Sequence, residues 1–491
     1  MRHWVAGMVA EKKVKFKLVE QRFFPTKKET KGSLAPKLKM GWNEMSWQKV
    51  SMLKSPGRQI CLAVLLSFAA SLFSAIPTTV TALPQLQDSL HRAIELVVAG
   101  EAEEATSLYY KILESSPDDS VAAQLFADIK DILTVAEITS YKQASDKGQW
   151  LLRFWQRLDP TPATPANERL VEHYRRLHVA RNRYRSPQPR GYDDRGMIYV
   201  RYGEPDEIYS AALGSLSRYG NVTRENESWV YHRLGDVNFD FVEYGGLYRL
   251  EVDLRKAIES VPQNLKGSII LWRDLFEQRQ HLNIRYQTTA NKLERILYSM
   301  SEDIPPQVAL AQAERAVTFD YIARSEEKQR ALPRYTTDFD LQEKRFDMIV
   351  SSAIFAQAKT SNLKNDQSRL EFYWAIPLQQ LRSANLFQKK ANRDLKMYFS
   401  IFTKDYQPVV RKNETIALDL AALLAQKDYL GQLTFFLQPD TYRVALDIRS
   451  PQTNQRGMMQ MLVDVPEFPR DRLSLSDIEL ASMVRPATEE D

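Results

Sequence analysis

The chain has 491 residues, 44% hydrophobic and 26% charged, which is long enough for roughly three domains of ~150 residues with packed cores. Its formal net charge of +5 arises at the beginning, where residues 1–51 hold 12 Lys and Arg against 4 acidic residues. The residues after Ala82 carry a net charge of −5, which argues against nucleic acid as the partner of the folded part.

The N-terminal region has the pattern of an export signal. No charged residue occurs from Gln59 to Gln87, residues 60–76 are strongly apolar, and small residues lead up to Ala82. This pattern predicts a signal peptide over 59–82 that is cleaved after Ala82. The alternative is an uncleaved, single-pass membrane anchor formed by residues 60–76, with residues 1–58 in the cytoplasm.

Residues 1–58 are either a basic tail or an over-extended gene start, with Met52 as the true initiator. In both cases the remainder is expected to be exported, as a periplasmic, secreted or envelope-associated protein. The one cysteine, Cys61, lies in the apolar segment. The folded part therefore has no disulfide, thiolate nucleophile or cysteine-ligated metal site.

Residues 83–145 are predicted to be helical. Helices are expected over 89–98, 101–115 and 121–140, with Gly100 closing the first. The spacing of Gly100, Ala105, Tyr109 and Pro117 is typical of a tetratricopeptide hairpin. Stable solenoids need about three such units and one is visible, so an unrelated helical hairpin is an equal alternative.

Residues 146–255 are predicted to form an α+β domain. A helix is expected from Pro165 to Arg185 with Thr164 as N-cap, and a strand over 197–202 before a turn at 203–206. Strands over 228–233, 238–243 and 247–254 complete a small antiparallel sheet packed on that helix.

Three arginines on the predicted helix recur every seven residues: Arg169, Arg176 and Arg183. We interpret them as a solvated face balanced by Glu168 and Glu172, the alternative being an anion-binding stripe.

Several separated motifs occur in order across residues 150–254. They are Phe154-Trp155, Asp159 to Pro162, Asn167-Glu168, Asp194 to Gly196, Ile198-Tyr199, Tyr202-Gly203, Pro205 to Ile208, Trp229 and Tyr231. This series resembles the GWxTD domain family, a group of bacterial exported or envelope proteins without an assigned molecular function. The naming motif differs: Asp193 stands in place of its Thr, and Gly191, or Tyr192 after a one-residue deletion, in place of its Trp. The resemblance implies export and domain identity, and no activity.

Residues 256–335 are predicted to be a helical connector, with a strand-like patch over 267–272 and a last helix over 307–332. Alternating apolar residues then predict strands near 370–376, 395–401, 433–437, 442–448 and 459–465. Their spacing favours an antiparallel β-sandwich over 336–470, followed by a tail over 471–491. The predicted fold class is therefore a multidomain α+β protein.

The best polar cluster is Asp193, Asp194, Arg195, Tyr199, Asp206 and Glu207. If Asp194 lies near Asp206 or Glu207, paired carboxylates could act as acid and base on a glycosidic bond or bind a hard cation. We prefer a structural interpretation, in which Asp194 caps the start of the strand, Arg195 pairs with Glu207 and Asp206 closes the turn.

No zinc-peptidase, nucleophile-elbow, P-loop or dinucleotide motif occurs, so the sequence predicts no metal and no cofactor. The favoured hypothesis is a non-enzymatic binding or scaffold protein whose partner is another protein or an envelope polymer. Residues 60–76 would supply any membrane association. The alternative is a carboxylate-dependent hydrolase of polysaccharide or glycan that uses the Asp194 and Asp206 region.

Overall fold

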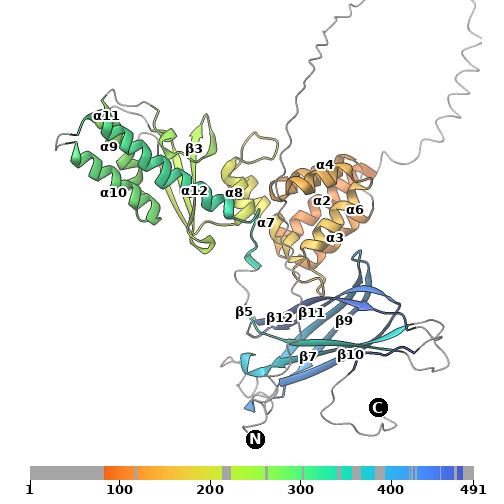
Figure 1. Ribbon diagram of the computed structural model, residues 1–491. Coiled ribbons are helices and arrows are strands. Elements are labelled where there is room, and N and C mark those ends of the chain that lie inside the picture. Colours follow the sequence, from red (N-terminus) through yellow and green to blue (C-terminus); the bar gives the residue numbers. More distant parts are fainter. Residues whose placement is uncertain are drawn as a thin grey trace, which may run out of the picture. The chain divides into compact units, whose positions relative to one another are not determined.

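The computed structural model describes residues 82–115, 119–212, 223–259, 264–300, 304–339, 344–356, 367–381, 393–419, 421, 424–425, 428–453, 455–468 and 473–478. The basic region and nearly all of the expected signal segment lie outside them. Within the described part the chain is α+β, as predicted, with helices in the N-terminal half and antiparallel sheets that include a C-terminal sheet region (Figure 1).

The first helices are α2 (Ala82–Ala99) and α3 (Ala102–Glu114), separated by Gly100 in the left-handed region at φ +89°. The prediction of one helix over 121–140 is wrong. The chain instead forms α4 (Asp119–Ile129), a 3₁₀ turn (Lys130–Ile132) and α5 (Val135–Gln143). A separate helix begins at Val135 because Thr134 and Glu137 form a reciprocal capping box there.

Helix α6 (Lys147–Leu158) precedes α7 (Glu168–Arg183). The predicted start of α7 at Pro165 is wrong, because the N-cap is Asn167, whose side chain accepts the Leu170 N–H at 2.9 Å. The hydroxyl of Thr164 instead donates to the carbonyl of Thr161 within the preceding loop.

Residues Asp194–Tyr202 form helix α8, so the predicted strand over 197–202 is wrong. Asp193 caps this helix and Gly203, at φ +77°, ends it. Every residue of α8 is buried or half-buried, because α7 packs against it and β4 (Leu247–Glu251) lies against it as well. A helix covered in this way shows no polar face and hence no clear period of 3.6.

A four-stranded antiparallel sheet follows α8, in the order β1 (Glu207–Ala211), β2 (Asn226–Tyr231), β3 (Val237–Tyr244) and β4. Trp229 and Phe241, on one face, join the core formed with α2 to α8. Val230 and Val242, on the other face, join a second core formed with the helices that follow the sheet. The sheet is therefore a layer between two helical layers (Figure 1).

The second helical layer consists of α9 (Leu265–Glu277), α10 (Ile284–Ser299), α11 (Pro306–Arg315), a π-helical segment (Ala316–Ile322) and α12 (Ala323–Ala331). The prediction of a strand-like patch over 267–272 is thus wrong, because these residues lie inside α9, whose N-cap is Asn264. A short apolar run is ambiguous between a strand and a buried helix. The long helix expected over 307–332 is present, with the π segment at its centre.

The C-terminal region contains two sheets. Their strands are β5 (Lys344–Arg345), β6 (Ile349–Ala356), β7 (Ser368–Pro377), β8 (Asp394–Thr403), β9 (Pro408–Ala417), β10 (Asp428–Leu437), β11 (Asp440–Ser450) and β12 (Gln455–Val465). One sheet has the order β10-β7-β6 and the other β5-β12-β11-β8-β9, with only the short β5–β12 pair parallel. Side chains from both sheets, such as Phe372 and Phe399, share one core.

Candidate functional site

The predicted polar cluster lies at the beginning of α8, and Asp193 is its organising residue. One oxygen of the buried Asp193 carboxylate accepts the backbone N–H groups of Arg195 at 3.0 Å and Gly196 at 3.4 Å. This is an N-cap, which satisfies two of the donors that the first turn of a helix leaves unpaired.

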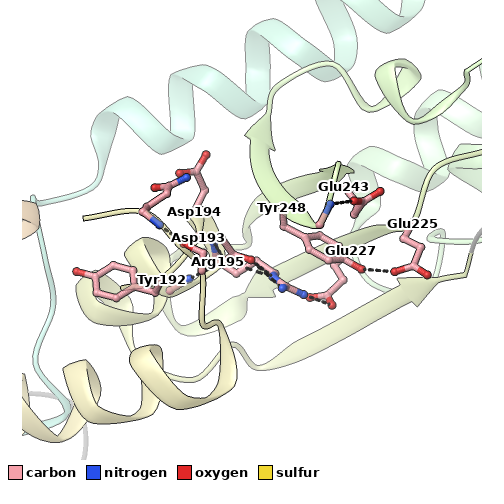
Figure 2. Close-up of polar contacts among 12 residues, drawn as sticks. Tyr192, Asp193, Asp194, Arg195, Glu225, Glu227, Glu243 and Tyr248 are labelled. Atoms are coloured by element: carbon pink, nitrogen blue, oxygen red, sulfur yellow. Dashed lines mark hydrogen bonds and ion pairs between the residues drawn. The ribbon is translucent and has the colours of Figure 1, made fainter. Parts of the chain in front are cut away.

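Arg195 joins this cap to the sheet. Its guanidinium donates to Asp193 Oδ2 at 2.8 Å and to Glu227 Oε1 on β2 at 2.8 Å, and it lies 3.5 Å from the ring centroid of Tyr248 on β4 (Figure 2). The expected pair of Arg195 with Glu207 is therefore wrong. Arg195 turns toward β2 and β4, whereas Glu207 lies 3.3 Å from His232.

The neighbouring acidic side chains also have partners within the chain. Glu227 accepts the indole N–H of Trp229 at 3.0 Å, and Glu225 accepts the hydroxyl of Tyr248 at 3.1 Å. Glu243 accepts the backbone N–H of Gly246, which closes the β3–β4 turn (Figure 2). These carboxylates therefore fix strands β2 to β4 relative to one another.

Asp194 and Asp206 bind different arginines. Asp194 accepts from Arg190 at 2.5 Å and from the backbone N–H of Leu250 at 2.9 Å. Asp206 accepts from the side chain of Arg233 at 2.5 Å and from its backbone N–H at 3.1 Å. Burial would raise the pKa of Asp206, but these hydrogen bonds and the charge of Arg233 outweigh it and lower the pKa.

The remaining predicted residue, Tyr199, is half-buried with its ring 5.8 Å from that of Tyr184. Burial and the negative charge of Glu204 raise its pKa. A phenol with a raised pKa is a weaker general acid, so the chemistry available to this cluster is chiefly that of ion pairs and caps.

A second site, not predicted from the sequence, is the loop between α6 and α7. Its first acidic residue is Asp159 and its last is Glu168, the first residue of α7. The loop lies against the five-stranded sheet, where the Pro160 carbonyl accepts from Gln460 at 3.0 Å and the Ala163 carbonyl from Ser400 at 3.3 Å.

Glu168 belongs to a closed ring of four charges. Arg449 and Arg456 each donate to Glu168 Oε1 at 3.0 Å, and the same two arginines also donate to Asp447. Arg449 and Arg456 are direct partners across the β11–β12 hairpin. The ring therefore joins the start of α7 to a hairpin more than 250 residues further along the chain, and we call it the Glu168 ring.

Asp447 and Arg449 alternate with apolar residues along β11, a pattern that places them on the solvent side. In the structure Asp447 is 1% exposed, because the loop covers this face. Burial raises the pKa of Asp447 to about 6 and that of Glu168 to about 7. The Asn167-Glu168 motif of the sequence analysis was the one sequence signal that could have indicated the Glu168 ring.

A cleft of about 280 Å³ adjoins the loop and is lined by Tyr110, Asp159, Thr164, Phe402 and Arg411, among others. Asp159 accepts the backbone N–H of Thr161 at 2.8 Å. Burial, together with the negative charge of Glu168, raises the pKa of Asp159 well above its ordinary value. The cleft therefore holds a carboxyl group that binds a proton more tightly than an ordinary aspartate does.

The interpretation of the arginine series as a solvated face is wrong for two of its members. Arg169 and Arg176 are only 1% and 3% exposed, and burial lowers the pKa of Arg169 to about 10. Arg176 pairs with Glu172 and donates to Asp338 at 2.9 Å, so it holds the segment after α12 against α7. Arg183 alone is half-exposed, and it pairs with Glu204.

A buried polar layer lies between the β1–β4 sheet and the second helical layer. Asp240 accepts hydroxyl hydrogens from Ser228 at 2.5 Å, Tyr286 at 2.7 Å and Tyr321. Arg279, fully buried, donates to Ser228 at 2.7 Å and to Asn226. The sequence carries no local signal for this layer, because its members come from β2, β3, α10, the π segment and the loop after α9.

Among the described residues, no group of three or more His, Cys, Asp or Glu side chains could hold a metal ion. None of the helices in that part of the chain is long and apolar enough to cross a membrane.

Comparison with known proteins gives a family match. Among curated proteins and solved structures no match is found. Residues 96–248 match the family model described as the GWxTD domain. The match runs from the end of α2 to β4 and covers most of the first core, including the Asp193 cap and the loop before α7. Residues 96–248 are therefore similar to the GWxTD domain family, and the expected resemblance is confirmed.

Proposed function

We propose that the protein is an exported or envelope-associated, non-enzymatic binding or scaffold protein. The α2–α3 hairpin would act as a tetratricopeptide-like surface, the GWxTD domain as the organising centre, and the two C-terminal sheets as a β-sandwich module. The partner would be another protein or an envelope polymer.

One observation carries this proposal: the charged groups of the GWxTD domain are used to hold elements together. Asp193 caps α8 and binds Arg195, and Asp194 binds Arg190 and β4. Glu168 binds the β11–β12 hairpin. Paired charges of this kind fix geometry, as a scaffold requires, and they are less available to a substrate.

Export rests on the sequence pattern over 59–82 and on what the resemblance to the GWxTD family implies. The mature protein would be periplasmic, secreted or attached to the envelope. In the alternative, residues 60–76 remain as a membrane anchor.

The proposal is tested by affinity capture of the full chain after cross-linking in living cells, with quantitative mass spectrometry of the envelope and secreted fractions. We expect a partner recovered in a fixed ratio and chemically unchanged. Asp194→Asn should retain that partner if Asp194 is structural. Recovery of a processed, shortened polymer in place of a stable partner would contradict the proposal.

A carboxylate-dependent hydrolase is the second candidate, and one observation favours it at a different place. Burial raises the pKa of Asp159 beside a cleft, and a neighbouring carboxyl, Glu168, has its pKa raised to about 7. A general acid needs such a pKa. Release of reducing ends from a panel of polysaccharides, abolished by Asp159→Asn but not by Asp194→Asn, would favour this candidate over the scaffold.

A further inference from the structure

The two C-terminal sheets have four edge strands: β6 and β10 in one sheet, β5 and β9 in the other. An edge strand offers unpaired N–H and C=O groups to any other extended chain, and proteins usually block or cover it. Three of these edges are protected. Strand β5 has two residues. On β6, the Ile354 carbonyl and N–H both bond to Asp477, at 3.0 and 2.8 Å. Strand β9 begins with Pro408 and carries Lys412 and Glu414.

Strand β10 has none of these protections. Its ten residues include no proline and one charge, Asp428 at the start. Its two largest outward-facing side chains are apolar and exposed, Leu430 by 74% and Phe436 by 46%. In the described part of the chain, no backbone hydrogen bond joins the side of β10 away from β7 to another segment. We call this free side of Asp428–Leu437 the β10 edge.

The inner face of β9 extends beyond the β10 edge. Lys412 and Glu414 stand opposite Phe399 and Met397 on β8, so they lie on the face of the sheet that carries the core. Their side chains are nevertheless 41% and 44% exposed. Phe399 stacks on Phe435 of β10 at 5.0 Å, which places β10 over β8. There is therefore a place for one more strand, beside β10 and over β9.

The surroundings of this place define the chemistry of its occupant. Successive side chains of a strand point to opposite faces, so an added strand would have an inner and an outer row. The inner row would meet Lys412 and Glu414, which pair with each other at 2.6 Å. The outer row would lie beside Leu430 and Phe436. The best occupant is thus an extended segment of about ten residues in which charged side chains alternate with apolar ones.

We propose that the β10 edge binds an extended segment of a partner protein, which joins the sheet as a strand. Its backbone pairs with β10, its charged side chains face Lys412 and Glu414, and its apolar side chains cover Leu430 and Phe436. This inference rests on the proposed binding function and narrows it. The partner is a protein and not a polysaccharide, because a polypeptide supplies the alternating N–H and C=O groups that the edge requires.

A second copy of this chain is a poorer occupant. Pairing of two β10 edges about a two-fold axis would continue the sheet from one copy to the other. Each β9, however, extends beyond its own β10, as the exposure of Lys412 and Glu414 indicates. The two β9 strands would then meet in the same place. A single strand from a partner avoids this clash.

A fluorescent ten-residue peptide, in which valine alternates with lysine and glutamate in turn, tests the proposal by anisotropy with the full chain. Leu430→Asp/Phe436→Asp should weaken its binding about tenfold, because the outer row loses its apolar contacts. The matched control is Leu462→Asp, at a 57% exposed position on β12, which should change nothing. No binding to the unmodified chain, or equal binding to both variants, would overturn the proposal.

A second peptide, in which valine alternates with lysine alone, tests the position over β9. Lys412→Glu should tighten its binding about tenfold, since the inner face of β9 then carries two acidic side chains. Lys396→Glu makes the same change of charge at an exposed position on the other face of the sheet, and it should have little effect. An equal gain in the two variants would show general charge attraction and overturn the placement.

Two further measurements separate the remaining occupants. A peptide with ¹³C-labelled carbonyl groups should show the infrared band of a β-strand when it binds, and an unchanged band would overturn strand addition. In sedimentation, a dimer abolished by Leu430→Asp/Phe436→Asp would assign the edge to a second copy and overturn the proposal.

Failure of this inference is distinguishable from failure of the proposed function. If the chain and its Leu430→Asp/Phe436→Asp variant capture the same partner equally well, the binding function stands and the β10 edge is excluded. If the peptides bind at β10 but cells yield no captured partner, the edge is supported and the scaffold function is contradicted.

Discussion

Asp193 combines a helix cap with an ion pair. Oδ1 accepts backbone N–H groups at the start of α8 and, at 3.4 Å, Nε of Arg195, whereas Oδ2 accepts only from the Arg195 guanidinium, at 2.8 and 3.1 Å. The cap and the ion pair are thus separable by substitution, because an asparagine can replace the first function but not the second.

We expect Asp193→Ala to lower the free energy of unfolding by about 2 kcal/mol, since it removes the cap and leaves Arg195 with one carboxylate fewer. Asp193→Asn should cost less than about 1 kcal/mol, because asparagine is an equally good N-cap. Urea unfolding of the two variants measures the difference. Equal losses would show that the ion pair, and not the cap, is the main contribution.

At the residue scale, the sequence could predict only contacts between near neighbours. Asp193, Asp194 and Arg195 lie within three positions, so their association is local. Glu227 and Tyr248 are 32 and 53 positions from Arg195, and no spacing rule connects them. The pairing of Glu168 with Arg456, 288 positions apart, is still further beyond what one sequence can indicate.

At the scale of elements, the predictions failed where a helix is covered on all sides. In α8 the apolar residues Ile198, Val200 and Tyr202 alternate as they would in a strand. The helix shows no polar face that would reveal its period, because every residue in it is at least half-buried. The helix was nevertheless marked by Asp193 at its N-cap and Gly203 at its end, and those signals could have decided the question. The C-terminal strands were predictable because each has one core face and one polar face.

Helix α8 also reverses the usual effect of a helical glycine. Gly→Ala inside a helix normally stabilises by up to about 1 kcal/mol. At Gly196 a Cβ atom would lie 2.6 Å from the Cβ of Tyr192, a position that side-chain rotation cannot relieve. We therefore expect Gly196→Ala to destabilise by about 1–3 kcal/mol.

The double variant Tyr192→Gly/Gly196→Ala provides the control for this prediction, because glycine removes the Cβ atom of residue 192. If the clash is the cause, the losses of stability in the two single variants, measured by thermal unfolding, should add to clearly more than the loss of stability in the double variant. Strict additivity would mean that Gly196 is required for another reason.

At the scale of the whole molecule, the Glu168 ring makes stability depend on pH. Burial raises the pKa of Glu168 to about 7 and that of Asp447 to about 6 in the folded protein. The folded state then holds more protons than the unfolded state between pH of about 4 and about 7. Stability contributed by these groups therefore falls as the pH rises through that window.

Comparison of the native chain with Glu168→Gln isolates this effect. Between pH of about 4.5 and 7, the free energy of unfolding of the native chain should fall by about 1–3 kcal/mol more than that of the variant, as measured by urea unfolding. Glu204→Gln, at an exposed ion pair, should behave like the native chain. An equal loss in native chain and Glu168→Gln variant would exclude Glu168 as the source.

The N-terminal region makes a separate prediction for the whole chain. If residues 59–82 are a cleaved signal, N-terminal sequencing of the exported protein should begin at Leu83, immediately after Ala82. Retention of Cys61, detected by thiol labelling of the membrane fraction, would instead identify residues 60–76 as an anchor.

The π-helical segment has a consequence for the tolerance of this protein to insertions and deletions. Such a segment amounts to one extra residue in an α-helix, and each residue turns the helix by about 100°. Tyr321, which reaches Asp240, and Phe319, which is 62% exposed, both lie in it. Because the segment absorbs its extra residue, deleting Thr318 would restore regular winding and leave α12 facing β3, where Gln329 donates to Asn238. A one-residue change within the regular helix α11 would instead turn Tyr321 and α12 by about 100° and disturb the buried layer.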